Sequence, residues 1–154
     1  MGFFQQLKTA TEAGRADLLA IPVLQDGARG GITLETYRAF LTEAYHHVKH
    51  TVPLLMACGA RLPEHHEWLR QAVGEYIQEE TGHHEWILDD IRACGGDAEA
   101  VRNGRPAPAT DVMVAYAWDT VQRRNPAGFF GMVLVLEGTS VELASRAAER
   151  LRER

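Results

Sequence analysis

The stretch TLETYRAFLTEAYHHVKHTVPLLMACGA, residues 33–60, decides the fold class of this chain. Its apolar residues recur at intervals of three and four, which is the spacing of one face of an α-helix. They are Leu34, Tyr37, Leu41, Ala44, Tyr45, Val48, Val52 and Leu55. Thr33 can cap the start of this helix, and Pro53 is expected to kink it. The pattern predicts one long helix from about residue 34 to Ala60.

The same helical spacing continues on both sides of this stretch, and alternating strand patterns are nearly absent. Helices are expected at about 2–20, 63–80, 83–94, 112–121 and 126–154, with connections at 21–31 and 103–110. Gly82 should interrupt one helix, and the pair Gly95-Gly96 should end the next. The sequence therefore predicts an all-α helical bundle, and its 154 residues suit a single domain over residues 1–154.

Composition excludes several classes of protein. The 16 Lys and Arg against 21 Asp and Glu give a net charge of −5, with no basic cluster for a nucleic acid partner. The two cysteines, Cys58 and Cys94, are too few for a disulfide framework. The longest apolar run, 129–136, is broken by Gly131 and is too short to span a membrane, and the N-terminus lacks an export signal. We expect a cytoplasmic protein without a membrane partner.

All seven histidines lie between His46 and His84. Glu43 and His50 are seven residues apart, so a continuous helix would place them on one strip, with His46 and His47 beside it. Carboxylates and imidazoles on the helices of a bundle suit iron or manganese. The alternative is that this strip faces solvent.

The second cluster of candidate ligands is EETGHHEW, residues 79–86. Glu80 with His84, or Glu79 with His83, has the i, i+4 spacing of neighbours on a helix. The alternative is a helix end at which the carboxylates are solvated. The pair His65 and His66 follows Pro63 in the first turn of a helix and is expected at the surface.

The third feature is the segment GFFGMVLVLEGTSVELASR, residues 128–146. Its residues 129–136 are apolar on every side of a helix and are expected to be buried all round. Glu137 follows on the stripe that includes Val141 and Ala144. A buried carboxylate requires a partner, either a metal or histidine, or else a tyrosine or arginine.

In order along the chain, these three features resemble the heme-oxygenase-like superfamily. The features are Glu43-x6-His50 followed by Pro53, the segment EETGHHEWILDDIRACGG (79–96), and the glycine-containing apolar helix that ends in LEGTS (136–140). More narrowly, they resemble its iron-containing redox enzymes, the diiron oxidases and oxygenases. These share their fold with TenA-type thiaminases, PqqC-like oxidases and true heme oxygenases. The resemblance covers the chain from about residue 20 to its end.

The resemblance implies a homodimeric oxidoreductase that binds two irons, activates O2 and oxidises a small amine, amino acid or fatty acid. It implies metal-ligand roles for Glu43, His50 and Glu137, and auxiliary roles for Glu80 and His84. The family's remaining ligands lie on a C-terminal helix with the motif His-x3-Asp-x2-His, which this sequence lacks. Either the sequence is part of a longer protein that continues into this helix, or the protein has lost these ligands. The alternative is a heme-oxygenase-like or TenA-like binding or scaffold protein that carries heme or another small molecule without metal catalysis.

Overall fold

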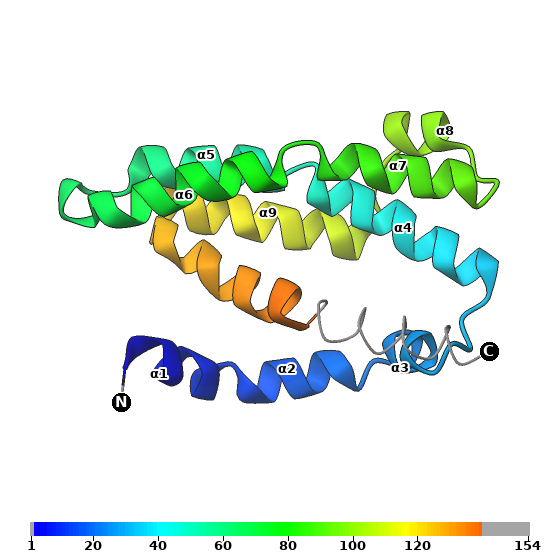
Figure 1. Cartoon of the computed structure of the whole chain (residues 1–154), viewed down its shortest axis with the longest axis horizontal. Coiled ribbons are helices and arrows are strands. Elements are labelled where there is room, and N and C mark those ends of the chain that lie inside the picture. The colour runs from blue at the N-terminus through cyan, green and yellow to red at the C-terminus, as the bar shows by residue number, and fades with distance from the viewer. Residues whose placement is uncertain (1, 140–154) are drawn as a thin grey trace. The chain divides into compact units, whose positions relative to one another are not determined.

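The computed structural model describes residues 2–139, and within this range every regular element is a helix (Figure 1). The predicted all-α class is therefore confirmed. The chain forms two compact units: residues 34–129 make up one, and the residues up to Thr33 belong with those from Phe130 onward to the other. No helix among the described residues is long and apolar enough to cross a membrane.

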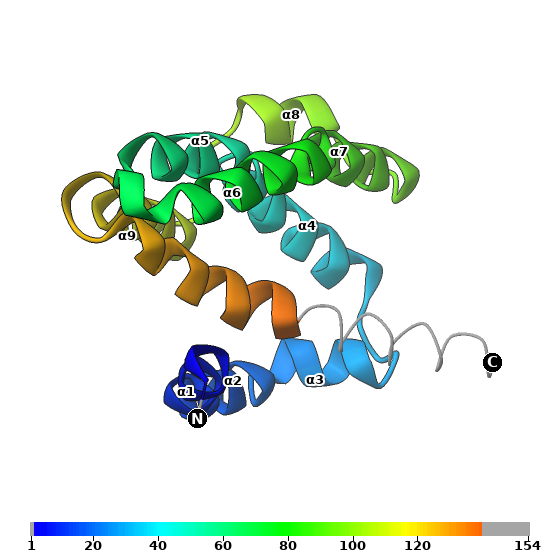
Figure 2. The same cartoon turned by 60° about the vertical axis from the view of Figure 1, so that its left-hand side comes forward.

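The unit of residues 34–129 is a layered set of antiparallel and crossing helices. Its elements are α4 (Leu34–Val48), α5 (Thr51–Arg61), η1 (Glu64–His66), α6 (Glu67–Glu80), α7 (His83–Ala93), α8 (Ala98–Asn103), α9 (Pro108–Arg123) and η2 (Pro126–Gly128). Helix α5 packs against α6 and α9, while α4 packs against α7 and α9. The figures show α6 and α7 following one another end to end (Figures 1 and 2).

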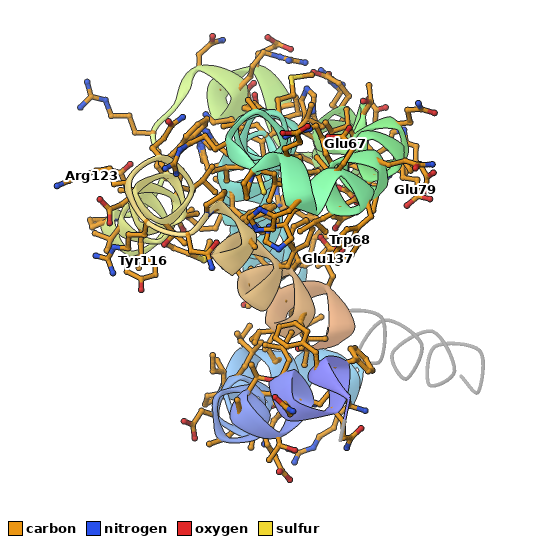
Figure 3. All side chains as sticks on the ribbon, turned by 90° about the vertical axis from the view of Figure 1, so that its left-hand side faces the viewer. Glu67, Trp68, Glu79, Tyr116, Arg123 and Glu137 are labelled. Atoms are coloured by element: carbon orange, nitrogen blue, oxygen red, sulfur yellow. The ribbon has the colours of Figure 1, made fainter. Side chains whose placement is uncertain are left out.

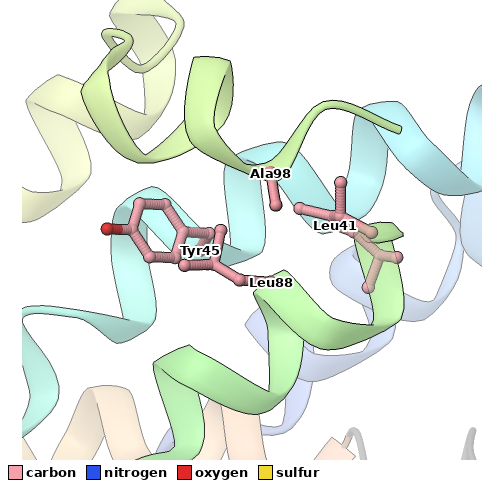
Figure 4. Packing of buried hydrophobic residues seen from close by; sticks show 5 residues of the cluster. Leu41, Tyr45, Leu88 and Ala98 are labelled. Carbon is pink, nitrogen blue, oxygen red and sulfur yellow. The ribbon is translucent and has the colours of Figure 1, made fainter. Parts of the chain in front are cut away.

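The core of this unit includes one cluster formed by α4, α7 and α8. Its buried members are Leu41, Tyr45, Leu88, Ile91 and Ala98 (Figure 4). Further buried side chains lie on α5, α6 and α9, among them Leu55, Val73 and Val121. Leu41, Tyr45 and Leu55 are buried as their helical spacing predicted, but Leu34 and Tyr37 of the same predicted stripe are 54% and 36% exposed.

The long helix predicted for residues 34–60 is in fact two helices. Helix α4 ends at Val48 and α5 begins at Thr51. Pro53 explains the break, because its ring would clash with the carbonyl of Lys49 in a continuous helix, and it has no N–H to donate. The expected disruption by Pro53 is therefore present, and what is wrong is the prediction of one helix from 34 to Ala60. Glu43 and His50 do not share one helical strip.

The joint between α6 and α7 follows the prediction. Gly82 has a φ of +95°, a left-handed conformation that glycine adopts without the steric cost of a Cβ. The end of α7 before Gly95 is also confirmed.

Helix α8 was not predicted, and α9 begins at Pro108, inside the stretch expected to be a connection. Asp97 starts α8 by accepting a hydrogen bond from the N–H of Ala100 at 2.9 Å.

The other unit contains α1 (Phe3–Ala10), α2 (Glu12–Leu19) and α3 (Pro22–Ala28), none of which has a buried residue. The helix predicted for 2–20 is interrupted at Thr11, and the expected connection at 21–31 contains α3, which Pro22 begins. A helix also runs over 129–139. The prediction that this helix is buried on all sides is wrong, since Phe129 is buried but 130–137 are half-buried. An apolar sequence favours burial, but burial also requires other segments that pack around the helix.

Candidate functional site

Glu80 and His83 meet across the joint between α6 and α7. Glu80 is the last residue of α6, and His83 is the first of α7. The Glu80 Oε2 and His83 Nδ1 atoms are 3.0 Å apart, and the side chains are 14% and 31% exposed. The left-handed Gly82 lets the chain turn within two residues, so the carboxylate and the imidazole face each other.

This pair fits a first-row metal in donor type and in spacing. Two ligands that are each about 2.1 Å from a metal and at right angles to one another lie about 3 Å apart. The separation of Oε2 and Nδ1 has that value. Carboxylate oxygen and imidazole nitrogen are the donor types of iron sites in helical bundles, although Glu80 and His83 lie on two successive helices rather than on one. The fit extends to these two donors, because residues 2–139 bring no three His, Cys, Asp or Glu side chains together around one metal position.

The structure brings Glu80 together with His83 rather than with the predicted His84. His84 Nε2 lies 3.4 Å from a carboxylate oxygen of Glu85. The i, i+4 rule applies only within a continuous helix, and Gly82 breaks the helix between Glu80 and His84. Sequence reasoning missed His83 as the partner of Glu80. The signal that could have found it is Gly82, which predicts a turn that brings the end of one helix next to the start of the other.

Glu43 lies on α4 and is bonded to the start of α9. Its carboxylate accepts hydrogen bonds from the backbone N–H of Ala107, at 3.2 and 3.1 Å, and from the Thr110 hydroxyl. A negative charge at a helix N-terminus is stabilised by the unpaired N–H groups and the helix dipole. In this arrangement Glu43 joins α4 to α9, and its role as a metal ligand stays a prediction.

His50 lies between α4 and α5 and contacts α9 through Trp118. The indole Nε1 donates to His50 Nδ1 at 3.4 Å. An indole nitrogen only donates, so Nδ1 carries the lone pair and the proton of the neutral ring is on Nε2. The role of His50 as a metal ligand stays a prediction. Burial lowers the pKa of His50, and nearby Lys49 and His46 lower it further against an opposing effect of Asp111.

The remaining histidines of α4 are also held in the neutral form. His46 is 2% exposed, and Lys49 Nζ lies 3.3 Å from its Nδ1. Burial lowers the pKa of His46, and the positive charge of Lys49 adds to the effect. Burial likewise lowers the pKa of His47, with a smaller contribution from His50.

Glu137 lies on the helix that runs over 129–139, and its side chain is half-buried (Figure 3). It belongs to the unit that includes α1–α3, whereas Glu80 and His83 belong to the unit of residues 34–129. Its role as a metal ligand stays a prediction from the resemblance. His65 is exposed as expected, while His66 is half-buried.

The helical architecture defines the class of fold. The chain is similar to the crystal structure of a domain of unknown function with a heme oxygenase-like fold from Shewanella denitrificans OS217. The two share 22% sequence identity with a TM-score of 0.69, over 99% of this chain and 72% of that one. The fold is therefore heme-oxygenase-like, as predicted. No curated protein sequence gives a significant match to the chain.

The family follows from the sequence of the same region. Residues 38–154 match the family described as iron-containing redox enzyme. The chain belongs to this family, which confirms the resemblance inferred from its three motifs.

Proposed function

We propose that this protein is an iron-dependent oxidoreductase that uses O2 to oxidise a small organic substrate, and that Glu80 and His83 hold its iron. The observation that carries the proposal is the 3.0 Å approach of the Glu80 carboxylate to His83 Nδ1. Membership of an iron-containing redox family supports the choice of metal. A small amine, an amino acid or a fatty acid is the proposed substrate, and a homodimer is the proposed assembly.

Each residue of the pair has a defined part in binding. When bound, iron would supply one-electron redox chemistry and the activation of O2. His83 Nδ1 and Glu80 Oε2 share a hydrogen bond in the metal-free protein, and Nδ1 would offer its lone pair to iron once the ring proton moves to Nε2. Glu80 would supply a carboxylate oxygen. Gly82 holds the two side chains at their separation by fixing the turn between the helices.

Anaerobic Fe(II) titration of the full chain, followed by metal analysis, tests the proposal. We expect the wild type to bind Fe(II), and Glu80→Ala and His83→Ala each to weaken binding by more than about tenfold, since ligands matter at least as much as their supporting residues. His84→Ala is the matched control and is expected to bind Fe(II) like the wild type. A folded wild-type protein that binds no first-row metal, or a His83→Ala variant with unchanged affinity, would refute the proposal.

The number of irons is tested in the same titration. We propose two irons per chain and a ligand role for Glu137, as the resemblance implies. Glu137→Ala is then expected to lower the iron content of the folded protein. An unchanged content would exclude that role without affecting Glu80 and His83.

Heme is the other cofactor that the resemblance raised. Added heme that gave a Soret shift in the wild type, lost in His50→Ala or His47→Ala, would favour a tetrapyrrole-binding protein over the proposed iron enzyme. A spectrum without that shift is the expected result, because Trp118 already donates to His50 Nδ1.

A further inference from the structure

Trp86 packs against the imidazole of His83. Both residues are in the first turns of α7, three positions apart. Their ring centroids are 4.5 Å apart, and the ring planes are inclined by 37°. Trp86 is nevertheless 63% exposed. Burial in the core therefore does not fix the position of this indole. Its ring contact is with the imidazole of His83.

The bond to Glu80 alone leaves His83 with a rotational freedom. One hydrogen bond restrains a single atom of the ring, so coupled changes of χ1 and χ2 can still rotate the plane of the imidazole while Nδ1 stays near Oε2. A ring that lies against one face of the imidazole blocks this rotation. Glu80 and Trp86 together therefore define both the direction and the plane of the His83 ring.

We propose that Trp86 is a positioning residue that fixes the plane of the His83 imidazole. Nδ1 then stays directed at the position that a metal held by both His83 and Glu80 would occupy. The benefit for metal binding rests on the proposed function. The positioning itself is a property of the metal-free protein. A ligand whose orientation is fixed in advance loses less conformational entropy when the metal binds.

Trp68 offers a matched control within the same unit. It is 68% exposed, close to the value for Trp86, and it also lies near a histidine. Its ring meets His66 edge-on at a centroid distance of 6.3 Å, so it does not cover the face of that imidazole. Replacing Trp68 removes the same amount of exposed indole without touching the Glu80–His83 pair.

Nuclear magnetic resonance on the metal-free protein tests the positioning directly. The ring current of Trp86 should shift the Cδ2–H and Cε1–H signals of His83, which His83→Ala assigns. We expect Trp86→Leu to move these signals, Trp86→Phe to retain most of the shift, and Trp68→Leu to leave them in place. His83 signals that are identical in the wild type and in Trp86→Leu would overturn the inference.

Fe(II) titration of the same variants tests the consequence for binding. We expect Trp86→Leu to weaken Fe(II) about tenfold, Trp86→Phe to recover affinity to within about threefold, and Trp68→Leu to match the wild type. Wild-type affinity in a folded Trp86→Leu variant would overturn the positioning role. Failure of the wild type to bind Fe(II) would refute the proposed function, and the His83 signals would still decide whether Trp86 fixes the ring.

Discussion

The histidines of this chain differ in which ring nitrogen carries the proton. Donors reach the Nδ1 atoms of His46 and His50, from Lys49 and Trp118, and place the proton of each neutral ring on Nε2. At His83 the Nδ1 atom faces the Glu80 carboxylate and carries the proton itself. The second arrangement keeps a carboxylate next to a nitrogen that would bind a metal once the ring proton moves to Nε2, which is why we propose the iron there.

The three lowered pKa values on α4 and at the start of α5 predict a dependence of stability on pH. The pKa values of His46, His47 and His50 are below the value of about 6.5 that applies in the unfolded chain. As the pH falls below about 6.5, the unfolded state takes up protons that the folded state resists. The contribution of the neutral histidines to the free energy of unfolding is therefore fully present above this pH. It declines below it, by at most about 1.4 kcal/mol per pH unit for each histidine.

Urea unfolding at pH 7.5, 6.5 and 5.5 measures this slope. His46→Gln should flatten the dependence, because it removes one group that the folded state keeps neutral. His65→Gln, at an exposed position, is the control and should keep the wild-type slope. A wild-type free energy of unfolding that stays constant from pH 7.5 to 5.5 would contradict the prediction.

At the residue scale, the sequence predicted the types of candidate ligand better than their pairing. Spacing selected Glu80 as a candidate ligand and paired it with His84, whereas the turn at Gly82 brings it next to His83. The role of Glu43 at α9 was not predictable either. Its partners Ala107 and Thr110 are more than sixty residues away, and local spacing contains no information on such contacts.

Helix α9 depends on Glu43 at its N-terminus. We predict that Glu43→Ala lowers the free energy of unfolding by about 1 kcal/mol, the usual cost of losing an acceptor for the first N–H groups of a helix. Glu43→Gln should cost less, because it keeps an oxygen that accepts hydrogen bonds. Chemical denaturation checks both variants.

The same two variants separate a structural role from metal binding. If Glu43 serves α9 alone, Fe(II) affinity should be unchanged in Glu43→Gln. A loss of affinity without a loss of stability would instead support the ligand role that the resemblance implies.

The joint between α6 and α7 depends on Gly82. A Cβ at this position would meet no atom within 4 Å, so the effect of Gly82→Ala comes from the backbone conformation alone. With a φ of +95°, we expect a loss of about 1–2 kcal/mol in the free energy of unfolding.

Gly74 provides the matched control for this prediction. It lies within α6, and an added Cβ there also meets nothing within 4 Å. Because alanine favours a helix interior, Gly74→Ala should leave the protein equally stable or more stable, by up to about 1 kcal/mol. Equal losses in both variants would contradict the argument from φ.

At the element scale, helices were predictable where periodicity was long and punctuated by glycine. The start of α7 after Gly82 and its end before Gly95 are examples. The disruption expected from Pro53 is present, and it lies at residues 49–50 because proline acts on the carbonyl four residues earlier. The six-residue α8 is too short for its apolar spacing to show, and its packing against α7 defines it.

At the scale of the whole molecule, composition and motif order predicted the fold class and the family, and both are confirmed. These properties are spread along many residues, so they survive errors at single positions. The division into the unit of residues 34–129 and the unit that contains α1–α3 was not predictable. It depends on which helices pack against each other, and the spacing of apolar residues is similar in both units.

Iron binding should couple the Glu80–His83 pair to the unfolding of the protein. A ligand that binds only the folded state stabilises it by about 2.7 kcal/mol at a free concentration one hundred times its Kd. The size of the chain predicts one domain, so we expect a single thermal transition whose midpoint rises with Fe(II) concentration. Differential scanning calorimetry under argon measures this, with His83→Ala expected to show no rise and His84→Ala the wild-type rise. Two separate transitions, with only one responding to Fe(II), would show that the two units unfold independently and would contradict the single-domain prediction.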